Sequence, residues 1–160
     1  MAEAPGVLLV EDSESDVFFF RQAMKKVGAS FPLRTAADGE AALDYLSGAP
    51  PPGDRGRSPL PLLTLLDLKI PKRSGFEVLE RIRSDPRLQS LRVLILTSSA
   101  EREDVRRAYD LGAVLYIPKP IGMESLRGLV RAISSYLNNP QIGPQPDLVA
   151  FSLPRPLPPV

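Results

Sequence analysis

Five short apolar runs, each followed by a segment with helical spacing, limit what this chain can fold into. The runs are too short for helices and are rich in Val, Leu and Ile, which favours buried strands. They lie at residues 6–10, 33–37, 62–66, 93–96 and 113–117. The helical patterns lie at residues 14–27, 40–46, 75–84, 101–111 and 123–137. This alternation predicts an α/β fold, a five-stranded parallel sheet that is doubly wound, with helices on both faces.

Length and composition exclude several classes of function. The chain has 160 residues, enough for one domain, and a net charge of +1, which creates no field for nucleic acid or a membrane surface. It contains no Cys and no His, which excludes disulfides, thiolate sites and His bases, ligands or phosphoacceptors. No apolar run approaches about 18 residues, and the N-terminus shows no secretion signal. We therefore expect a cytoplasmic protein without a nucleic acid or membrane partner.

Reactive side chains follow four of the five predicted strands. They are Glu11 and Asp12 after the first strand, Asp67 after the third, Thr97 after the fourth and Lys119 after the fifth. In a parallel sheet all carboxyl ends lie at one edge, where open α/β sheets bind their ligands. One acid at a strand end is more often a helix cap, and one lysine is more often a solvated surface residue. The whole set at one edge is difficult to explain by capping.

The residue types predict phosphoryl chemistry at this edge. Three clustered carboxylates repel one another unless a cation joins them, and hard oxygen ligands without His or Cys favour Mg²⁺. Asp67 is then the candidate nucleophile, whose carboxylate oxygen attacks phosphorus and forms an acyl phosphate. Lys119 would neutralise the phosphoryl oxygens, and the Thr97 hydroxyl would donate to one of them.

Four stretches carry a resemblance to a known family: VLLVEDSESD, LLDLKIPKRSGFEVLERIR, VLILTSS and YIPKPI. Over about residues 6–137 the chain resembles the CheY-like response-regulator receiver domains of two-component signalling. The resemblance implies a flavodoxin-like (βα)5 fold and a phosphorelay protein that accepts a phosphoryl group from a sensor histidine kinase. It implies no enzyme beyond self-catalysed phosphoryl transfer and autodephosphorylation.

The resemblance also implies a role for each residue of the metal site. Asp67 is the phosphoacceptor, Asp12 binds Mg²⁺ directly and Glu11 binds it largely through water. Asp67 and the backbone carbonyl of Lys69 complete the protein ligands. Lys69 departs from the family's common pattern, in which this residue is often uncharged. It is either a solvated lysine or a cation that leans over the phosphoryl oxygens and hinders the attacking water.

The remaining roles concern the phosphoryl group and the switch. By resemblance, Thr97 and Lys119 are the hydroxyl and the lysine that hold the phosphoryl group. Tyr116 is the switch aromatic, which turns inward when Thr97 moves toward the phosphate, and the Lys119–Pro120 bond is cis. The polar helix at 101–111 has weak apolar anchoring, so we expect the surface made by that helix, the fifth strand and the fifth helix to change on phosphorylation.

Within the family, the chain is similar to stand-alone response regulators encoded beside phytochrome kinases. The similarity lies in the long loop before the third strand and in the sequence around Asp67. This similarity implies a phytochrome-type kinase as phosphodonor. It also implies a homodimer built on the fourth helix, fifth strand and fifth helix. The downstream partner is not identifiable from the sequence.

Three other functional classes compete with this hypothesis. An aspartyl-phosphate hydrolase of the haloacid-dehalogenase type needs a second Asp where this chain has Lys69. A nucleotide-binding Rossmann domain needs a Gly-rich turn where this chain has Glu11 and Asp12. A phosphorylation-independent dimerisation module with the same fold remains an alternative.

We expect three regions: an N-terminal tail at 1–5, the receiver domain at 6–137, and a tail at 138–160 that is too short for an effector domain. A Pro- and Gly-rich insertion at 48–61 is either a functional loop or a tolerated one. The C-terminal tail contains seven prolines, which predicts polyproline II rather than helix. It is either disordered or an arm that packs Phe151, Leu153 and Leu157 on a partner subunit. Its PRPLPP sequence also resembles ligands of Pro-binding domains.

Overall fold

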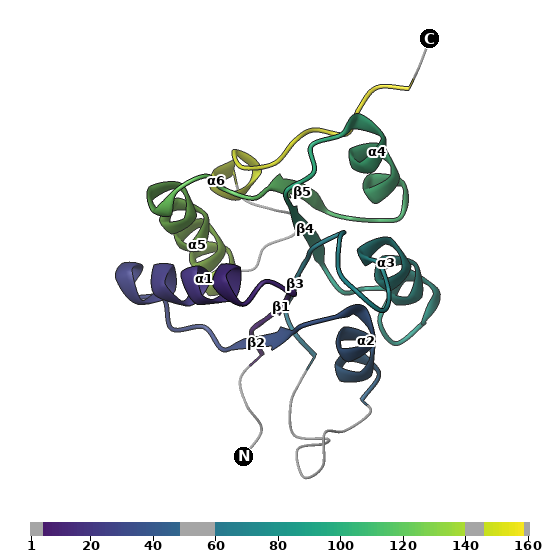
Figure 1. Ribbon diagram of the computed structural model, residues 1–160, viewed down its shortest axis with the longest axis horizontal. Helices are drawn as coiled ribbons and strands as arrows, with labels where there is room; N and C mark the ends of the chain where they lie inside the picture. Colours follow the sequence, from purple (N-terminus) through teal and green to yellow (C-terminus); the bar gives the residue numbers. More distant parts are fainter. Residues whose placement is uncertain (1–4, 49–59, 140–145, 159–160) are drawn as a thin grey trace.

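The computed structural model describes residues 5–48, 60–139 and 146–158, and it confirms the predicted fold class (Figure 1). Five parallel strands form one sheet in the order β2-β1-β3-β4-β5. The strands are β1 (Val7–Val10), β2 (Leu33–Ala36), β3 (Leu63–Leu66), β4 (Val93–Thr97) and β5 (Leu115–Pro118). The helices are α1 (Glu14–Val27), α2 (Gly39–Ser47), α3 (Gly75–Ser84), α4 (Arg102–Asp110), α5 (Met123–Asn138) and the short α6 (Pro146–Val149).

The helices cover both faces of the sheet. Figure 1 shows α1 and α5 on one face and α2, α3 and α4 on the other. Each face has its own hydrophobic core, because successive side chains of a strand point to opposite sides. Leu8 and Val10 join the core beneath α2 to α4, whereas Val7 and Leu9 join the core beneath α1 and α5. Strands β1 and β3 are buried along their whole length, as their near-continuous apolar sequence predicts.

The predicted element boundaries are accurate to within two residues, and the largest difference is at β5. This strand begins at Leu115 rather than at residue 113. The reason is local: the backbone N–H of Ala113 donates to the carbonyl of Ala108, so Ala113 still belongs to the turn that ends α4.

Capping residues start the helices directly beside the strand ends. The Ser13 side chain, three residues after the end of β1, accepts a hydrogen bond from the Asp16 N–H and so caps the start of α1. At the other end of α1, Gly28 adopts the left-handed conformation with φ 71° that suits glycine. Phe18 and Phe19 on this helix are 55% and 47% exposed, so both lie partly in solvent.

The C-terminal tail is where the sequence prediction was wrong. Rather than remaining extended throughout, it forms α6, whose Leu148 is fully buried in the core beneath α5. It then crosses the edge of the sheet, where Leu153 forms an antiparallel bridge with Tyr116 of β5. The Pro content prevents a long helix, but the edge strand supplies unpaired backbone groups with which the tail forms hydrogen bonds. Within this single chain, residues 146–157 of the tail therefore pack on the domain rather than lie free in solvent. An arm on a partner subunit stays a prediction.

Most of the predicted insertion at 48–61 lies outside the described residues, as does the start of the tail at 140–145. Within the described residues, no helix is both long enough and apolar enough to cross a bilayer.

Candidate functional site

Three carboxylates meet at the carboxyl edge of the sheet. Glu11 and Asp12 follow β1, Asp67 follows β3, and these two strands are neighbours in register. One carboxylate oxygen from each of the three side chains lies within 4.8 Å of the others. Glu11 and Asp67 are each 5% exposed, whereas Asp12 is exposed. The convergence expected from the strand ends is therefore present.

Thr97 and Lys119 converge on the Asp67 carboxylate. The Thr97 hydroxyl donates to Oδ1 at 2.8 Å, and the Lys119 Nζ lies 2.9 Å from Oδ2. The backbone N–H of Lys69 donates to Oδ1 at 3.2 Å, while the Lys69 side chain is exposed. Both Asp67 oxygens are thus held by donors that come from three different strand ends.

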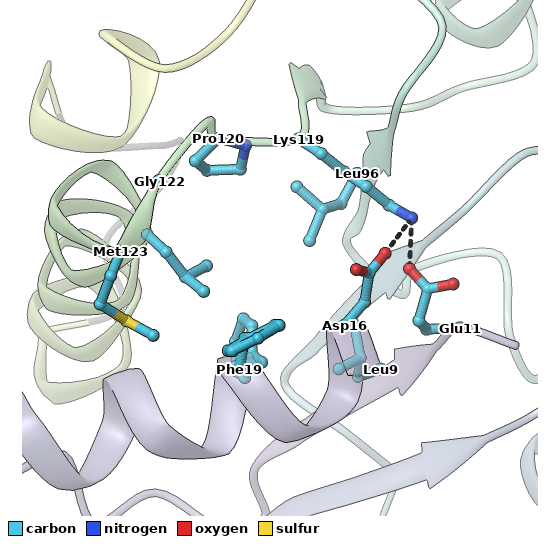
Figure 2. A pocket seen from close by; sticks show the side chains of 11 residues that line it. Leu9, Glu11, Asp16, Phe19, Leu96, Lys119, Pro120, Gly122 and Met123 are labelled. Carbon is cyan, nitrogen blue, oxygen red and sulfur yellow. Dashed lines mark hydrogen bonds and ion pairs between the residues drawn. The ribbon is translucent and has the colours of Figure 1, made fainter. Parts of the chain in front are cut away.

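A fourth carboxylate, Asp16, was not predicted as part of the site. The Lys119 Nζ lies 2.5 Å from Glu11 Oε1 and 2.8 Å from Asp16 Oδ2, as the dashed lines in Figure 2 show. Asp16 is an acidic residue in the first turn of α1, where a carboxylate also favours the helix N-terminus. Its place four residues after Asp12, on a helix that starts at the site, is the signal that could have revealed it.

Lys119 and the acids around it affect one another's pKa. Burial alone would lower the pKa of Lys119, but its hydrogen bonds to Asp16, Glu11 and Asp67 raise that pKa above its usual value. Burial raises the pKa of Glu11, and the hydrogen bond from Lys119 opposes this shift. Lys119 is therefore a permanent cation at neutral pH, and it compensates acids that would otherwise repel one another.

A cavity of about 280 Å³ opens beside Lys119 between α1 and α5. Its walls are mainly apolar side chains, namely Leu9, Phe19, Phe20, Leu96, Met123 and Leu126. Its polar rim is formed by Glu11, Asp16 and Lys119 (Figure 2). Asp67 does not line it, so this cavity lies next to the carboxylate cluster rather than over it.

Tyr116 is fully buried, with its ring turned inward. Its hydroxyl donates to the carbonyl of Ser99 at 2.9 Å, and burial raises the pKa of the phenol. Ser99 follows Thr97 by two residues, so the β4–α4 loop connects Tyr116 to the hydroxyl that contacts Asp67. The switch roles of Thr97 and Tyr116 remain predictions.

The prediction that the Lys119–Pro120 bond is cis is wrong, because no peptide bond among the described residues is cis. A trans bond before proline is favoured by about 0.5–1 kcal/mol. With this trans backbone the Lys119 side chain already reaches all three of its carboxylates.

The donor set fits a divalent cation. Glu11, Asp12 and Asp67 offer hard carboxylate oxygens from two adjacent strand ends, and the exposed Asp12 leaves a path to solvent. The backbone carbonyl of Lys69, expected as a further ligand, belongs to the loop that directly follows Asp67. Its part in metal binding remains a prediction.

The family model for the response regulator receiver domain matches residues 7–131 of this chain. Among curated proteins, the chain is 37% identical over 130 residues to the probable methanogenesis regulatory protein FilR2 of Methanothrix harundinacea, covering 81% of each. It is 35% identical over 130 residues to the response regulator Rcp1 of Synechocystis sp., covering 81% of this chain and 86% of Rcp1.

Solved structures give the same result. Response regulator RPA3017, described in red light signalling of R. palustris, matches with a TM-score of 0.79 and 30% identity over 89% of this chain and 99% of its own. The Mn²⁺-bound form of Rcp1 and the phosphorylated cyanobacterial phytochrome response regulator RcpA each match with a TM-score of 0.74. Their identities are 33% and 30%, over 89% of this chain and 100% of theirs. Relatives of the same fold have thus been crystallised with a divalent metal and in a phosphorylated state.

Proposed function

We propose that this chain, which belongs to the response regulator receiver domain family, accepts a phosphoryl group on Asp67 from a sensor histidine kinase. The proposal is carried by one observation, the convergence of the Thr97 hydroxyl and the Lys119 ammonium on the two Asp67 oxygens. These are the groups that a phosphoryl transfer to a carboxylate requires: a nucleophile, a hydrogen-bond donor and a cation.

The transfer follows from the positions of these groups. An Asp67 carboxylate oxygen forms the new bond to phosphorus, and the bond from phosphorus to the donor histidine nitrogen breaks. Lys119, already 2.9 Å from Asp67, would neutralise charge on the phosphoryl oxygens. Thr97, which now donates to Asp67, would donate to a phosphoryl oxygen after a small movement.

Mg²⁺ is the cation proposed for the carboxylate cluster, with Asp12 and Asp67 as direct ligands, Glu11 acting through water and the Lys69 carbonyl completing the protein ligands. When bound, it would supply the positive charge that lets an anionic phosphoryl group approach three carboxylates. The existence of a Mn²⁺-bound form of Rcp1 supports divalent metal binding by this chain.

The proposed output is a change in the surface formed by α4, β5 and α5, which we call the α4–β5–α5 face. Thr97 precedes the loop into α4, and Tyr116 on β5 holds that loop through the Ser99 carbonyl. A movement of Thr97 toward a phosphoryl group would therefore act on both α4 and β5. The likeness to the phytochrome response regulator RcpA, and to RPA3017, which is described in red light signalling, supports a phytochrome-type kinase as donor. A homodimer built on this face stays a prediction.

Exposure to a small acyl phosphate with Mg²⁺, followed by intact mass spectrometry, tests the proposal. Wild type should gain one phosphoryl group, and the Asp67→Asn variant should gain none. Asp44→Asn, at an exposed acid on α2, is the matched control and should behave as wild type. A phosphate adduct on Asp67→Asn, or none on wild type, would contradict the proposal and favour a phosphorylation-independent interaction module.

A further inference from the structure

The C-terminal segment 146–157, which we call the strap, lies across the α4–β5–α5 face (Figure 1). It begins on the α5 side of the sheet, where Leu148 of α6 is fully buried. Phe151 follows, and its ring lies against Gly128 of α5. A Cβ added at Gly128 would be only 3.2 Å from the Phe151 ring, so the absence of a side chain there makes room for the strap.

The middle of the strap pairs with the backbone of β5. The Leu153 N–H donates to the Tyr116 carbonyl at 2.8 Å, and the Tyr116 N–H donates to the Ser152 hydroxyl oxygen at 2.9 Å. Ser152 Oγ also lies 3.1 Å from the Tyr116 carbonyl oxygen, to which it can donate. Strand β5 is at the edge of the sheet, so these bonds occupy backbone groups that an added strand would use.

The end of the strap is held by α4. The Tyr109 hydroxyl donates to the Leu153 carbonyl, and the Arg102 guanidinium donates to the Leu157 carbonyl at 3.0 Å. Arg155 of the strap forms an ion pair with Asp110 at the end of α4. The strap therefore contacts all three elements of the face through apolar burial, backbone hydrogen bonds and charge.

We propose that the strap is a resident ligand of the α4–β5–α5 face, and that a partner binds there by displacing it. The partner would be an extended peptide of the strap's own chemistry, which adds to the edge of β5. Such a peptide carries an aliphatic residue, a Phe three positions later, then Ser and Leu, as do Leu148, Phe151, Ser152 and Leu153. The aliphatic and Phe anchors occupy the α5 side, and the Leu packs on the α4 side.

The strap is also placed to respond to chemistry at Asp67. It bonds both backbone groups of Tyr116, whose hydroxyl bonds the Ser99 carbonyl in the loop after Thr97. If phosphorylation moves Thr97, which is the part of this inference that rests on the proposed function, Tyr116 transmits the movement to the strap. By linkage, displacement of the strap then changes how readily Asp67 is phosphorylated.

Competition with a labelled peptide of sequence 146–157 tests the proposal in the full chain. The Leu148→Asp variant places a charge in the buried anchor site and should release the strap. Because apparent affinity scales with the fraction of molecules whose face is free, Leu148→Asp should bind the peptide more than about tenfold tighter than wild type. Leu157→Asp makes the same change where the side chain is 79% exposed, and should match wild type.

Adding Gly128→Leu to Leu148→Asp should abolish the gain, because the new side chain fills the place of Phe151. Equal peptide binding by wild type and Leu148→Asp, or a gain that survives Gly128→Leu, would overturn the proposal. Even if Leu148→Asp does not fold, amide hydrogen exchange of wild type, measured by NMR, tests whether the strap packs on its own chain. The Tyr116 and Leu153 amides should be protected equally at low and high protein concentration, whereas protection that rises with concentration would mean that a second copy supplies the strap.

A phosphorylation experiment tests the coupling between Asp67 and the strap. After treatment with acyl phosphate and Mg²⁺, intact mass reports uptake on Asp67, and exchange of the Leu153 amide reports the strap. Uptake with faster exchange supports the coupling. Uptake with unchanged exchange refutes the coupling and leaves the proposed function standing. Absence of uptake refutes the proposed function and the coupling, while peptide competition still decides whether the strap is a resident ligand.

Discussion

The packing of the C-terminal tail makes a prediction that needs no assumption about function. Leu148 is fully buried, and its side chain belongs to the core beneath α5. Replacing a buried Leu by Ala costs about 2 to 5 kcal/mol, from lost burial and the cavity that remains. We expect Leu148→Ala near the lower end of this range, because α6 can undock locally and so limit the loss in global stability.

The assay is urea unfolding of the full chain, with thermal unfolding as a second measure. For a protein of this size, each kcal/mol lost from the free energy of unfolding lowers the thermal midpoint by about 2 to 4 °C. Leu148→Ala should therefore melt at least about 4 °C below wild type. Leu157→Ala removes the same side chain from a position that is 79% exposed, and should change stability by less than about 0.5 kcal/mol. If Leu148→Ala were as stable as Leu157→Ala, the tail would not be packed on the domain.

Three further predictions concern the site and its surroundings. Lys69→Asn should lose phosphate from Asp67 faster than wild type, because the exposed Lys69 side chain can no longer hinder the attacking water. Radiolabel retention measures this, and equal or slower loss in the variant would refute the role. Gly75→Ala should lower the urea midpoint, because a Cβ there would lie 2.3 Å from the Asp67 carbonyl oxygen; an unchanged midpoint would contradict the close approach. Tyr116→Phe should cost about 1 kcal/mol at neutral pH, through the lost hydrogen bond to Ser99. Burial raises the pKa of Tyr116 above 10.0, so its contribution is present below pH 10 and lost as pH rises through the higher folded pKa. Wild type should therefore lose stability more steeply than Tyr116→Phe above pH 10, and parallel curves would show that the phenol is not protected.

The fold and most of the site could be predicted because each depended on short stretches of sequence. Apolar runs and caps such as Ser13 and Gly28 set where strands and helices begin and end, and these signals are local. Once the strands were assigned as parallel, their carboxyl ends had to share an edge. The meeting of Asp67 with Thr97 and Lys119 followed from that geometry, although their functional roles did not.

Contacts that join distant parts of the chain were the ones missed. Asp16 was not predicted as a site residue, because nothing near it in the sequence shows that Lys119 will lie 2.8 Å away. The isomer of the bond before Pro120 was taken from the family and was wrong, since it depends on the surroundings of Lys119 rather than on the dipeptide.

By itself the sequence determined an alternating α/β chain whose strand ends carry acids, a hydroxyl and a lysine, because periodicity and strand-end chemistry are encoded within a few residues. Only the tertiary structure decided where the Pro-rich tail goes. The unpaired backbone of β5, the space beside Gly128 and the charge of Asp110 come together only after the domain has folded. A tail that locally favours extended backbone therefore docks across the α4–β5–α5 face, because the surface that binds it does not exist in the sequence alone.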